Sequence, residues 1–476
     1  MNNLSNLEPK EVFKWFYEIN QHPRSSGNEK EISDFLVNFA KERNLEVYQD
    51  EILNVIIKKP GTPGYENSET VIIQGHMDMV CVKTDDSCHN FDIDPIEMIV
   101  DGDILRANKT TLGGDDGIAV AYGLAILDAD DIPHPPIELL VTTNEETGMD
   151  GAMALTSEHL TGTRLLNLDT EEEGCFLVSC SGGSNIDSIF EVERESTNSK
   201  AYELVISGLK GGHSGAEIHM QRGNSIKLAA RILHSIKKDI VLASIDGGIK
   251  HNAVPSFTKA VFTCDNYAEL KDSVEKLIDD IKEEYRVEEP DLNISVQDSN
   301  TTETYTKDLS NRLINFLMVL PDGVQYMSKD IDGLVQTSLN NAIISEIDGK
   351  LVLVTSVRSA STSSLREILN RIASLCEAFG ANSKEYASYP AWQYEAESKL
   401  RDISVETYEE LFGKAPEISS IHAGLECGLL KGILPNTEMI SFGPDIKDAH
   451  TPLEHMSISS VERMWKFTKK LLENLK

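Results

Sequence analysis

The sequence predicts an α/β protein in which one domain is interrupted by a second, inserted α+β domain. Its 476 residues exceed the length at which a single hydrophobic core stops growing, so two domains are expected. Short apolar runs alternate with helical patterns in the first part of the chain, which is typical of βαβ units around a sheet. The pattern changes near Arg194, and the segment from Tyr394 onward again supplies a strand. We therefore expect one domain at residues 1–193 and 392–476 and the inserted domain at residues 194–391.

The first domain begins with a predicted helix at residues 29–46, where apolar side chains recur at helical spacing. Three apolar runs, at residues 71–73, 137–142 and 165–168, predict buried strands. A polar cluster with His, Asp or Glu follows each of these strands. Because open α/β sheets place ligand sites at the carboxyl ends of their strands, we expect these clusters to form one functional site.

The inserted domain begins with a predicted strand at residues 202–207, after a polar stretch. The same patterns predict further elements. The predicted helices cover residues 224–238, 268–285, 308–320 and 364–379, and the predicted strands cover residues 260–263, 341–347 and 351–357. This mixture indicates an α+β architecture.

Composition excludes several classes of partner. The chain carries 78 acidic and 44 basic residues, a formal charge of −34, which repels phosphate backbones and anionic lipids. We therefore expect no nucleic-acid and no membrane partner, and the acidic excess by itself favours only solubility. Residues 1–10 lack the features of a secretory signal, and no apolar run is long enough to span a bilayer. The seven cysteines are scattered without a C-x-x-C pair, which favours free thiols in a cytoplasmic protein.

His76 and Asp78 follow the predicted strand at residues 71–73. In extended backbone, residues two apart point to the same side, so the carboxylate can lie beside the imidazole. A carboxylate in that place fixes the ring of a metal-binding His and raises its basicity. The H-x-D pair is common by chance, so alone it defines no site.

Asp115 and Asp116 lie between glycines at the start of an apolar helical run, residues 118–127. A helix N-cap is one explanation, because Asp is favoured there and the helix dipole stabilises its charge. One Asp can cap the helix while the other faces a metal ion. Both interpretations therefore stay open.

Three further groups carry candidate ligands. Glu145 and Glu146 follow the strand at residues 137–142, Asp169 closes the strand at residues 165–168, and His450 lies in a loop rich in Gly and Pro. Each has an ordinary explanation, since adjacent glutamates and a lone loop His are usually surface residues. Together, two imidazoles and three carboxylates suit a pair of divalent ions such as zinc, cobalt or manganese. Two ions and one bridging hydroxide would balance the three carboxylates, and a remaining glutamate could take the proton of the water.

These motifs resemble those of the M20 metallopeptidase family. The matching residues are His76-Met77-Asp78, Gly114-Asp115-Asp116-Gly117, Glu145-Glu146-Thr147-Gly148, Asp169 and His450, with supporting stretches at residues 22–27, 150–152, 211–215 and 422–428. The likeness covers nearly the whole chain and departs at Asn144, where an Asp is expected. The resemblance implies a di-metal, phosphorylase/hydrolase-like catalytic domain with a mixed sheet, plus an inserted lid domain.

The resemblance also implies the role of each metal-site residue. The implied ligand sets are His76, Asp115 and Asp169 for one ion, and Asp115, Glu146 and His450 for the other, with Asp115 bridging the two. Glu145 would be the general base, and Asp78 would orient His76. The peptide bond between Asp115 and Asp116 is expected to be cis.

Three residues of the implied lid resemble substrate-binding residues of the family. His213 would stabilise the oxyanion, Asn252 would contact the substrate backbone, and Arg358 would bind the free C-terminal carboxylate. The alternatives are that residues 211–215 form a plain turn and that Arg358 is a surface residue at a strand end.

The activity implied is broad-specificity hydrolysis of dipeptides, including Xaa-His, by a water that bridges two divalent ions. Zinc is the first expectation for the metal, with cobalt or manganese as alternatives. The oligomeric state, monomer or homodimer, is not decided by the sequence. Competing activities within the family are tripeptide aminopeptidase, carboxypeptidase and N-acyl amino acid deacylase. A metal-binding protein without activity is disfavoured because Glu145 has no ligand duty. A Ser or Cys hydrolase is disfavoured because no G-x-S-x-G motif is present.

Overall fold

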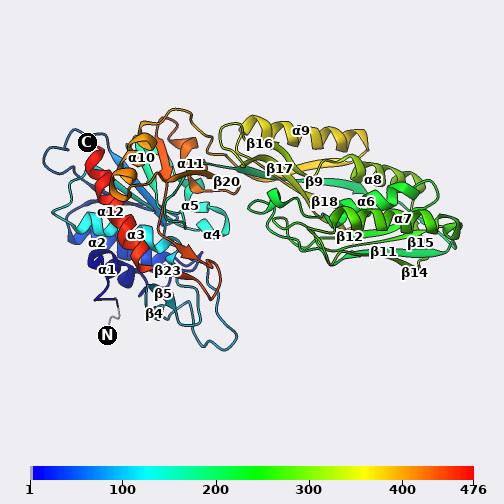
Figure 1. The fold of residues 1–476 in the computed structure, drawn as a ribbon, viewed down its shortest axis with the longest axis horizontal. Coiled ribbons are helices and arrows are strands. Elements are labelled where there is room, and N and C mark those ends of the chain that lie inside the picture. Colours follow the sequence, from blue (N-terminus) through cyan, green and yellow to red (C-terminus); the bar gives the residue numbers. More distant parts are fainter. Residues whose placement is uncertain (1–3) are drawn as a thin grey trace. The chain divides into compact units, whose positions relative to one another are not determined.

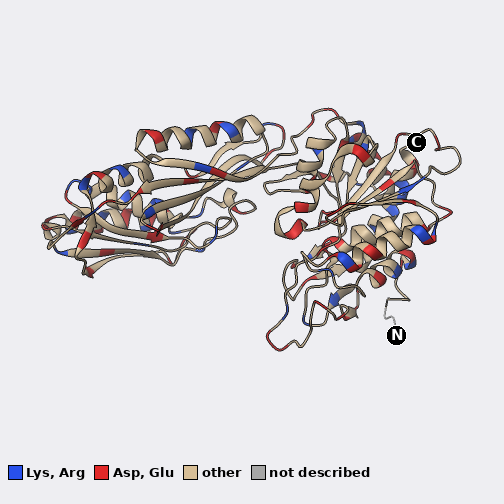
Figure 2. Cartoon of the chain, turned by 180° about the vertical axis from the view of Figure 1, so that it is seen from behind, with Lys and Arg blue, Asp and Glu red and all other residues tan. Residues whose placement is uncertain are grey.

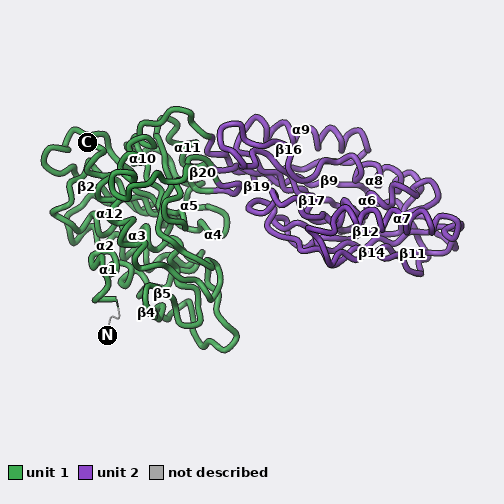
Figure 3. Tube along the Cα trace, in the orientation of Figure 1, with its two compact units in different colours: residues 1–179, 394–420, 425–476 green, residues 180–393, 421–424 purple. Residues whose placement is uncertain are grey.

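The computed structural model describes residues 4–476, which form two compact units (Figure 3). The first unit comprises the chain up to Ser179 with Tyr394–Ser420 and Leu425–Lys476, and the second comprises Cys180–Gln393 and Ile421–Gly424. The inserted unit thus begins earlier than the expected residue 194. The reason is that β9 (Gly182–Glu191) pairs along its whole length with β18 (Lys350–Ser359), in the sheet of the second unit.

Figure 1 shows the fold as a ribbon coloured along the sequence. The first unit is built on an eight-stranded sheet with the strand order β1-β2-β6-β3-β7-β21-β8-β20. The strands are β1 (Glu46–Gln49), β2 (Val55–Lys59), β3 (Val71–His76), β6 (Ile137–Thr142), β7 (Arg164–Asn167), β8 (Cys175–Cys180), β20 (Glu417–Ile421) and β21 (Glu438–Ser441). β3, β6, β7 and β21 are parallel, whereas β2 and β8 join them antiparallel, so the sheet is mixed, as predicted. His76 pairs with Thr142, and Gln74 pairs with Asn167. The carboxyl ends of β3, β6 and β7 therefore lie together.

The centre of this unit is α3 (Gly114–Asp128), whose side chains are apolar on all sides, as expected of a buried helix. A Cβ at Gly123 would lie 2.3 Å from Leu139 in β6, so glycine allows the helix to approach the sheet closely. On another side, the Tyr122 hydroxyl donates a hydrogen bond to the Val461 carbonyl at 2.8 Å. The other helices are α1 (Lys10–Ile19), α2 (Lys30–Glu42), α4 (Glu145–Gly148), α5 (Asp150–Ala154), α10 (Lys399–Phe412), α11 (Glu426–Ile433) and α12 (Ile458–Asn474), with a 3-10 turn at Ser157–His159.

A small antiparallel sheet of the first unit presents the loop that carries His450. Its strands, in order, are β22 (Ile446–Lys447), β23 (His455–Ser457), β5 (Ile104–Ala107) and β4 (Met98–Asp101). β22 and β23 form a hairpin in which Lys447 pairs with His455. The loop between them, residues 448–454, is therefore closed at its base.

The second unit contains a nine-stranded antiparallel sheet with helices packed on it through one apolar core. The strands run in the order β14-β11-β13-β12-β17-β18-β9-β19, and β16 also pairs with β17. Their bounds are β11 (Ala201–Ser207), β12 (Val241–Gly247), β13 (Thr258–Thr263), β14 (Asn293–Ser299), β16 (Gly323–Met327), β17 (Val335–Ile347) and β19 (Asn382–Tyr389), and β10 (Arg194–Ser196) pairs separately with β15 (Glu303–Tyr305). The helices are α6 (Ser225–Ile236), α7 (Tyr267–Tyr285), α8 (Lys307–Val319) and α9 (Thr362–Ala378), with a 3-10 turn at Ile218–Met220.

The strands predicted at residues 341–347 and 351–357 form the long β17-β18 hairpin, and a tight turn separates them. Its turn is Asp348-Gly349, and both residues have positive φ, 50° and 73°. Asp-Gly is the favoured sequence for the two-residue turn that matches the twist of paired strands.

In Figure 2, the positions of Asp and Glu are coloured along the chain, and they occur throughout both units. None of the helices in residues 4–476 has the length and apolar character needed to cross a membrane.

Candidate metal centre

The predicted ligands of the first unit come together where β3, β6 and β7 end. His76 is the last residue of β3, Glu145 and Glu146 open α4 just after β6, and Asp169 follows β7. Asp115 lies in the first turn of α3. His450 reaches the same place from the β22-β23 loop.

Asp115 lies between the two imidazoles. Its Oδ1 is 3.1 Å from His76 Nε2, and its Oδ2 is 3.1 Å from His450 Nε2. His450 Nε2 is also 3.0 Å from the carboxylate of Glu146, and His76 Nε2 is 3.8 Å from Asp169 Oδ1. A carboxylate with one oxygen directed at each of two imidazoles has the geometry of a bridging ligand.

Charge in this cluster favours a cation. Burial lowers the pKa of His76, but the hydrogen bonds that its ring donates to the carboxylates of Asp115 and Asp78 outweigh burial and hold the pKa well above its usual value. Hydrogen bonds with Asp115 and Glu146 raise the pKa of His450 to about 11. Burial and then the neighbouring carboxylates Asp116 and Asp115 raise the pKa of Asp169 well above its usual value. Divalent ions would replace the protons on the imidazoles and relieve the repulsion between the carboxylates, so the residues present fit such ions.

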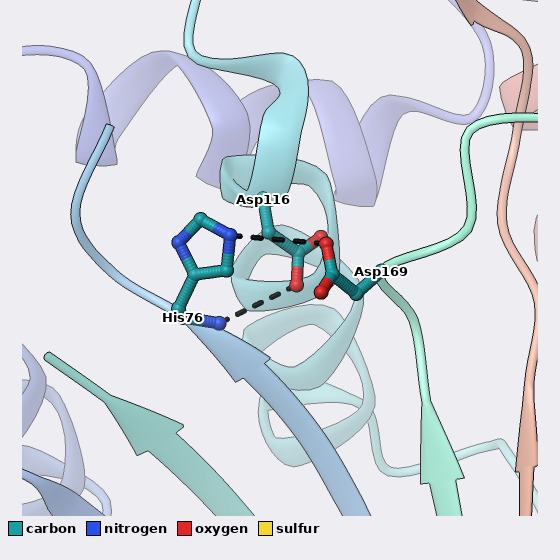
Figure 4. Close-up of side chains that lie close together, drawn as sticks. All are labelled: His76, Asp116 and Asp169. Carbon is teal, nitrogen blue, oxygen red and sulfur yellow. Dashed lines mark hydrogen bonds and ion pairs between the residues drawn. The ribbon is translucent and has the colours of Figure 1, made fainter. Parts of the chain in front are cut away.

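Asp116 is a further carboxylate of the centre, and Figure 4 shows it beside His76 and Asp169. Its side chain is 1% exposed and accepts a hydrogen bond from the backbone N–H of His76 at 3.4 Å. One potential metal-ligand atom from each of His76, Asp116 and Asp169 lies within 4.8 Å of the other two. The N-cap position of α3 is Gly113, so neither Asp occupies it. The peptide bond between Asp115 and Asp116 is cis, which confirms that expectation.

Asp78 ties His76 to the turn that carries the glutamates. One of its oxygens is 3.4 Å from His76 Nδ1, and its carboxylate accepts hydrogen bonds from the backbone N–H groups of Glu145 at 3.1 Å and Glu146 at 3.3 Å. Ser26 donates a further hydrogen bond to it at 2.8 Å. Asp78 is thus placed to orient both the imidazole and α4.

Glu145 lies beside the cluster, with a carboxylate oxygen within 4.8 Å of donor atoms of His76 and Glu146. Burial raises its pKa to about 8, and the nearby carboxylates Glu426 and Glu146 add to the rise, while His76 opposes it. A carboxyl group whose pKa lies near neutrality is suited to accept and return a proton.

The second unit holds its own cluster of polar side chains around Gly215. A Cβ at Gly215 would lie 3.1 Å from His213 Cε1 and 3.2 Å from Arg358 Nε, so these two predicted residues are neighbours. His213 Nδ1 accepts hydrogen bonds from the backbone N–H groups of Gly215 and Ala216, so the ring N–H is at Nε2. Asn252 lies alongside, since its carbonyl accepts a hydrogen bond from the Ser214 N–H at 2.9 Å. The motif is therefore a turn as well as the carrier of His213.

Arg358 has partners that sequence reasoning missed. Its Nη1 donates a hydrogen bond to the Tyr389 hydroxyl at 2.8 Å, while its buried Nε reaches no partner within residues 4–476. His422 lies nearby, with Nδ1 2.8 Å from Ser181 Oγ and Nε2 2.7 Å from Ser338 Oγ. Burial and then the Arg358 charge lower the pKa of His422 to about 3, so this imidazole is neutral.

Three buried charged residues of the first unit were also missed. Arg24 donates hydrogen bonds to the carbonyls of Met77, Asp78 and Gly113. Glu426 accepts hydrogen bonds from Gln74 at 2.6 Å and Thr142 at 2.7 Å, and Glu454 accepts several backbone hydrogen bonds near Asp115. Arg24 and Glu426 lie in the supporting stretches at residues 22–27 and 422–428, which is the signal that could have found them.

The chain is similar to known proteins over nearly its whole length. A sequence profile described as peptidase family M20/M25/M40 matches residues 72–474. The cytosol non-specific dipeptidase of Escherichia coli (strain K12) is 36% identical over 482 aligned residues, covering 100% of this chain and 99% of that protein. The crystal structure of an aminoacylhistidine dipeptidase from Vibrio alginolyticus superposes with a TM-score of 0.93 at 36% identity, covering 99% of this chain and 98% of the other. An aminopeptidase PepT from Bacillus cereus shares the fold, with a TM-score of 0.56 at 14% identity over 98% of this chain and 99% of the other.

Proposed function

The chain belongs to the M20/M25/M40 peptidase family, and from this premise we propose that it hydrolyses dipeptides of broad specificity, including Xaa-His, with the help of two divalent metal ions. The similarity to two dipeptidases over nearly the whole chain supports dipeptides as the substrate class. The single observation that carries the metal dependence is Asp115, whose two carboxylate oxygens each lie 3.1 Å from a different imidazole. The E. coli relative is named for the cytosol, and we propose the same compartment for this protein.

His76, Asp115 and Asp169 would hold one ion, and Asp115, Glu146 and His450 the other. When bound, such ions polarise a carbonyl and lower the pKa of water. Imidazole and carboxylate ligands suit zinc, with cobalt or manganese as alternatives.

Glu145 would move the proton. Its carboxylate accepts a proton from the attacking water and returns it to the amine that leaves when the peptide bond breaks. The hydrogen bond from its own backbone N–H to Asp78 fixes the turn on which it lies, and Asp78 holds His76 in place at the same time. Proton acceptor and ligand are therefore oriented by one side chain.

His213, Asn252 and Arg358 would bind the substrate. Arg358 offers a guanidinium whose Nε has no partner among the described residues, which suits a free C-terminal carboxylate. His213 has an Nε2 left for the developing oxyanion, and Asn252, in the adjoining loop, would contact the substrate backbone.

A substrate panel tests the proposed function. Metal-loaded protein is assayed on a dipeptide, a tripeptide and an N-acetyl amino acid under the same conditions. We expect the dipeptide to have the highest kcat/KM. A higher value for the tripeptide or the N-acetyl amino acid would assign the chain to another activity of the family.

A further inference from the structure

Glu454 makes an unusual set of contacts next to the metal centre. Its side chain is 2% exposed, and its carboxylate accepts hydrogen bonds from four consecutive backbone N–H groups. Oε2 accepts from Leu112 at 2.7 Å and Gly113 at 3.0 Å, and Oε1 accepts from Gly114 at 2.7 Å and Asp115 at 3.4 Å. The backbone N–H groups of the loop that leads into Asp115 thus stabilise the charge of this buried carboxylate.

The loop is shaped to receive this carboxylate. Gly113 has a φ of 69°, a left-handed conformation that turns successive N–H groups toward one point. On the opposite side, Arg24 Nη2 donates a hydrogen bond to the Gly113 carbonyl at 2.6 Å. A Cβ at Gly113 would lie 2.3 Å from that nitrogen. Glu454 therefore binds the N–H groups of this loop, and Arg24 binds its Gly113 carbonyl.

Glu454 also belongs to the loop that carries His450. Its backbone N–H donates to the Thr451 carbonyl at 3.1 Å, so the two residues lie on one short turn between β22 and β23. Two residues of this turn contact Asp115, one through its backbone and the other through its side chain. The Glu454 carboxylate holds the Asp115 backbone, and His450 Nε2 lies 3.1 Å from Asp115 Oδ2.

We propose that Glu454 is a positioning residue of the metal centre, which sets the distance between Asp115 and His450 so that both can bind the same ion. The inference rests on the proposed function in that it requires ions at these residues. Partners behind the ligands typically change metal affinity by about 10- to 100-fold when they are removed. A purely structural role for Glu454 would leave that affinity unchanged.

Glu138 provides a matched control in the same unit. It is also 2% exposed, and it accepts hydrogen bonds from the backbone N–H groups of Thr161 at 2.9 Å and Gly162 at 3.0 Å. It is the second residue of β6, whereas the metal centre lies at the other end of that strand. Replacing Glu138 by Gln removes a buried charge and weakens similar backbone hydrogen bonds at a place away from the ligands.

The test uses full-length protein stripped of metal and titrated with Zn²⁺ against a chromophoric chelator, as wild type, Glu454→Gln and Glu138→Gln. We expect Glu454→Gln to bind Zn²⁺ about 10- to 100-fold more weakly and to recover its kcat when Zn²⁺ is in excess. Glu138→Gln should lose thermal stability but bind Zn²⁺ like the wild type.

Zinc affinity of Glu454→Gln equal to that of the wild type would overturn the inference, and so would an activity loss that excess Zn²⁺ does not restore. If Glu454→Gln does not fold, Glu454→Asp, which keeps the charge but shortens the reach, is measured with the same two outcomes. Wild-type protein that binds no pair of ions would instead refute the proposed function, and Zn²⁺ binding without dipeptide hydrolysis would refute only its substrate class.

Discussion

Changing Tyr389 to Phe should weaken binding of substrates that have a free carboxylate. The Tyr389 hydroxyl accepts a hydrogen bond from Arg358 Nη1 at 2.8 Å, so its own O–H is left to donate to an anion bound by Arg358. Phe removes that donor and also the group that holds the guanidinium. A hydrogen bond to a charged group contributes about 1.5–3 kcal/mol, which corresponds to a rise in KM of roughly 10- to 100-fold.

The assay compares a dipeptide with the same dipeptide blocked as a C-terminal amide. The KM for the free dipeptide should rise in Tyr389→Phe with little change in kcat, and the KM for the amide should stay near the wild-type value. Tyr386→Phe is the matched control, because Tyr386 lies on the same strand and its hydroxyl contacts Asp187 instead. An equal rise in KM for both substrates, or no rise in KM for either, would show that Tyr389 and Arg358 do not bind the C-terminal carboxylate.

Three other outcomes follow from the structure. Glu145→Gln should lower kcat by about 10²- to 10⁴-fold while metal content, measured by elemental analysis, stays at the wild-type level, and near-normal turnover would remove Glu145 from its role. Dialysis against a chelator should abolish hydrolysis, and Zn²⁺, Co²⁺ or Mn²⁺ should restore it, whereas activity in metal-free protein would contradict a metal-dependent reaction. Asp322→Asn should stabilise the protein by up to about 3 kcal/mol above pH 6 and little below pH 4 in urea unfolding, and equal stability of both proteins at pH 7 would contradict this. Burial raises the pKa of Asp322 from 3.8 to about 6, so the unfolded chain loses its proton first and stability falls across that interval. Asn keeps the one oxygen, Oδ1, that accepts from Asn224 and Asn341.

The strands that carry the site could be predicted because buried parallel strands are continuous apolar runs. β3 and β6 include the predicted runs at residues 71–73 and 137–142, and β7 (Arg164–Asn167) ends one residue before the predicted run at residues 165–168 does. The polar residues after each run mark the place where the strands end. The helix predicted at residues 29–46 is shorter in the structure, where α2 spans Lys30–Glu42. Asn44 has a φ of 56°, a left-handed conformation that does not continue a right-handed helix.

Other parts depend on contacts between distant segments, for which a local pattern carries no signal. β9 belongs to the second unit only because β18, far along the chain, pairs with it. Glu454 and Tyr389 look like ordinary surface residues in the sequence. Their proposed roles depend on contacts with distant segments, the loop before Asp115 and strand β18 with Arg358. His422 likewise acquires its two serine partners from distant segments, Ser181 between β8 and β9 and Ser338 in β17.

The position of β21 has a consequence for how this protein is made. β21 (Glu438–Ser441) is inserted between β7 and β8, and His450 follows it by only a few residues. A ribosome must therefore translate most of the message before the sheet has its full set of strands. A nascent chain that stops short of this segment lacks a central strand of the sheet and His450, so it cannot form the complete set of proposed metal ligands.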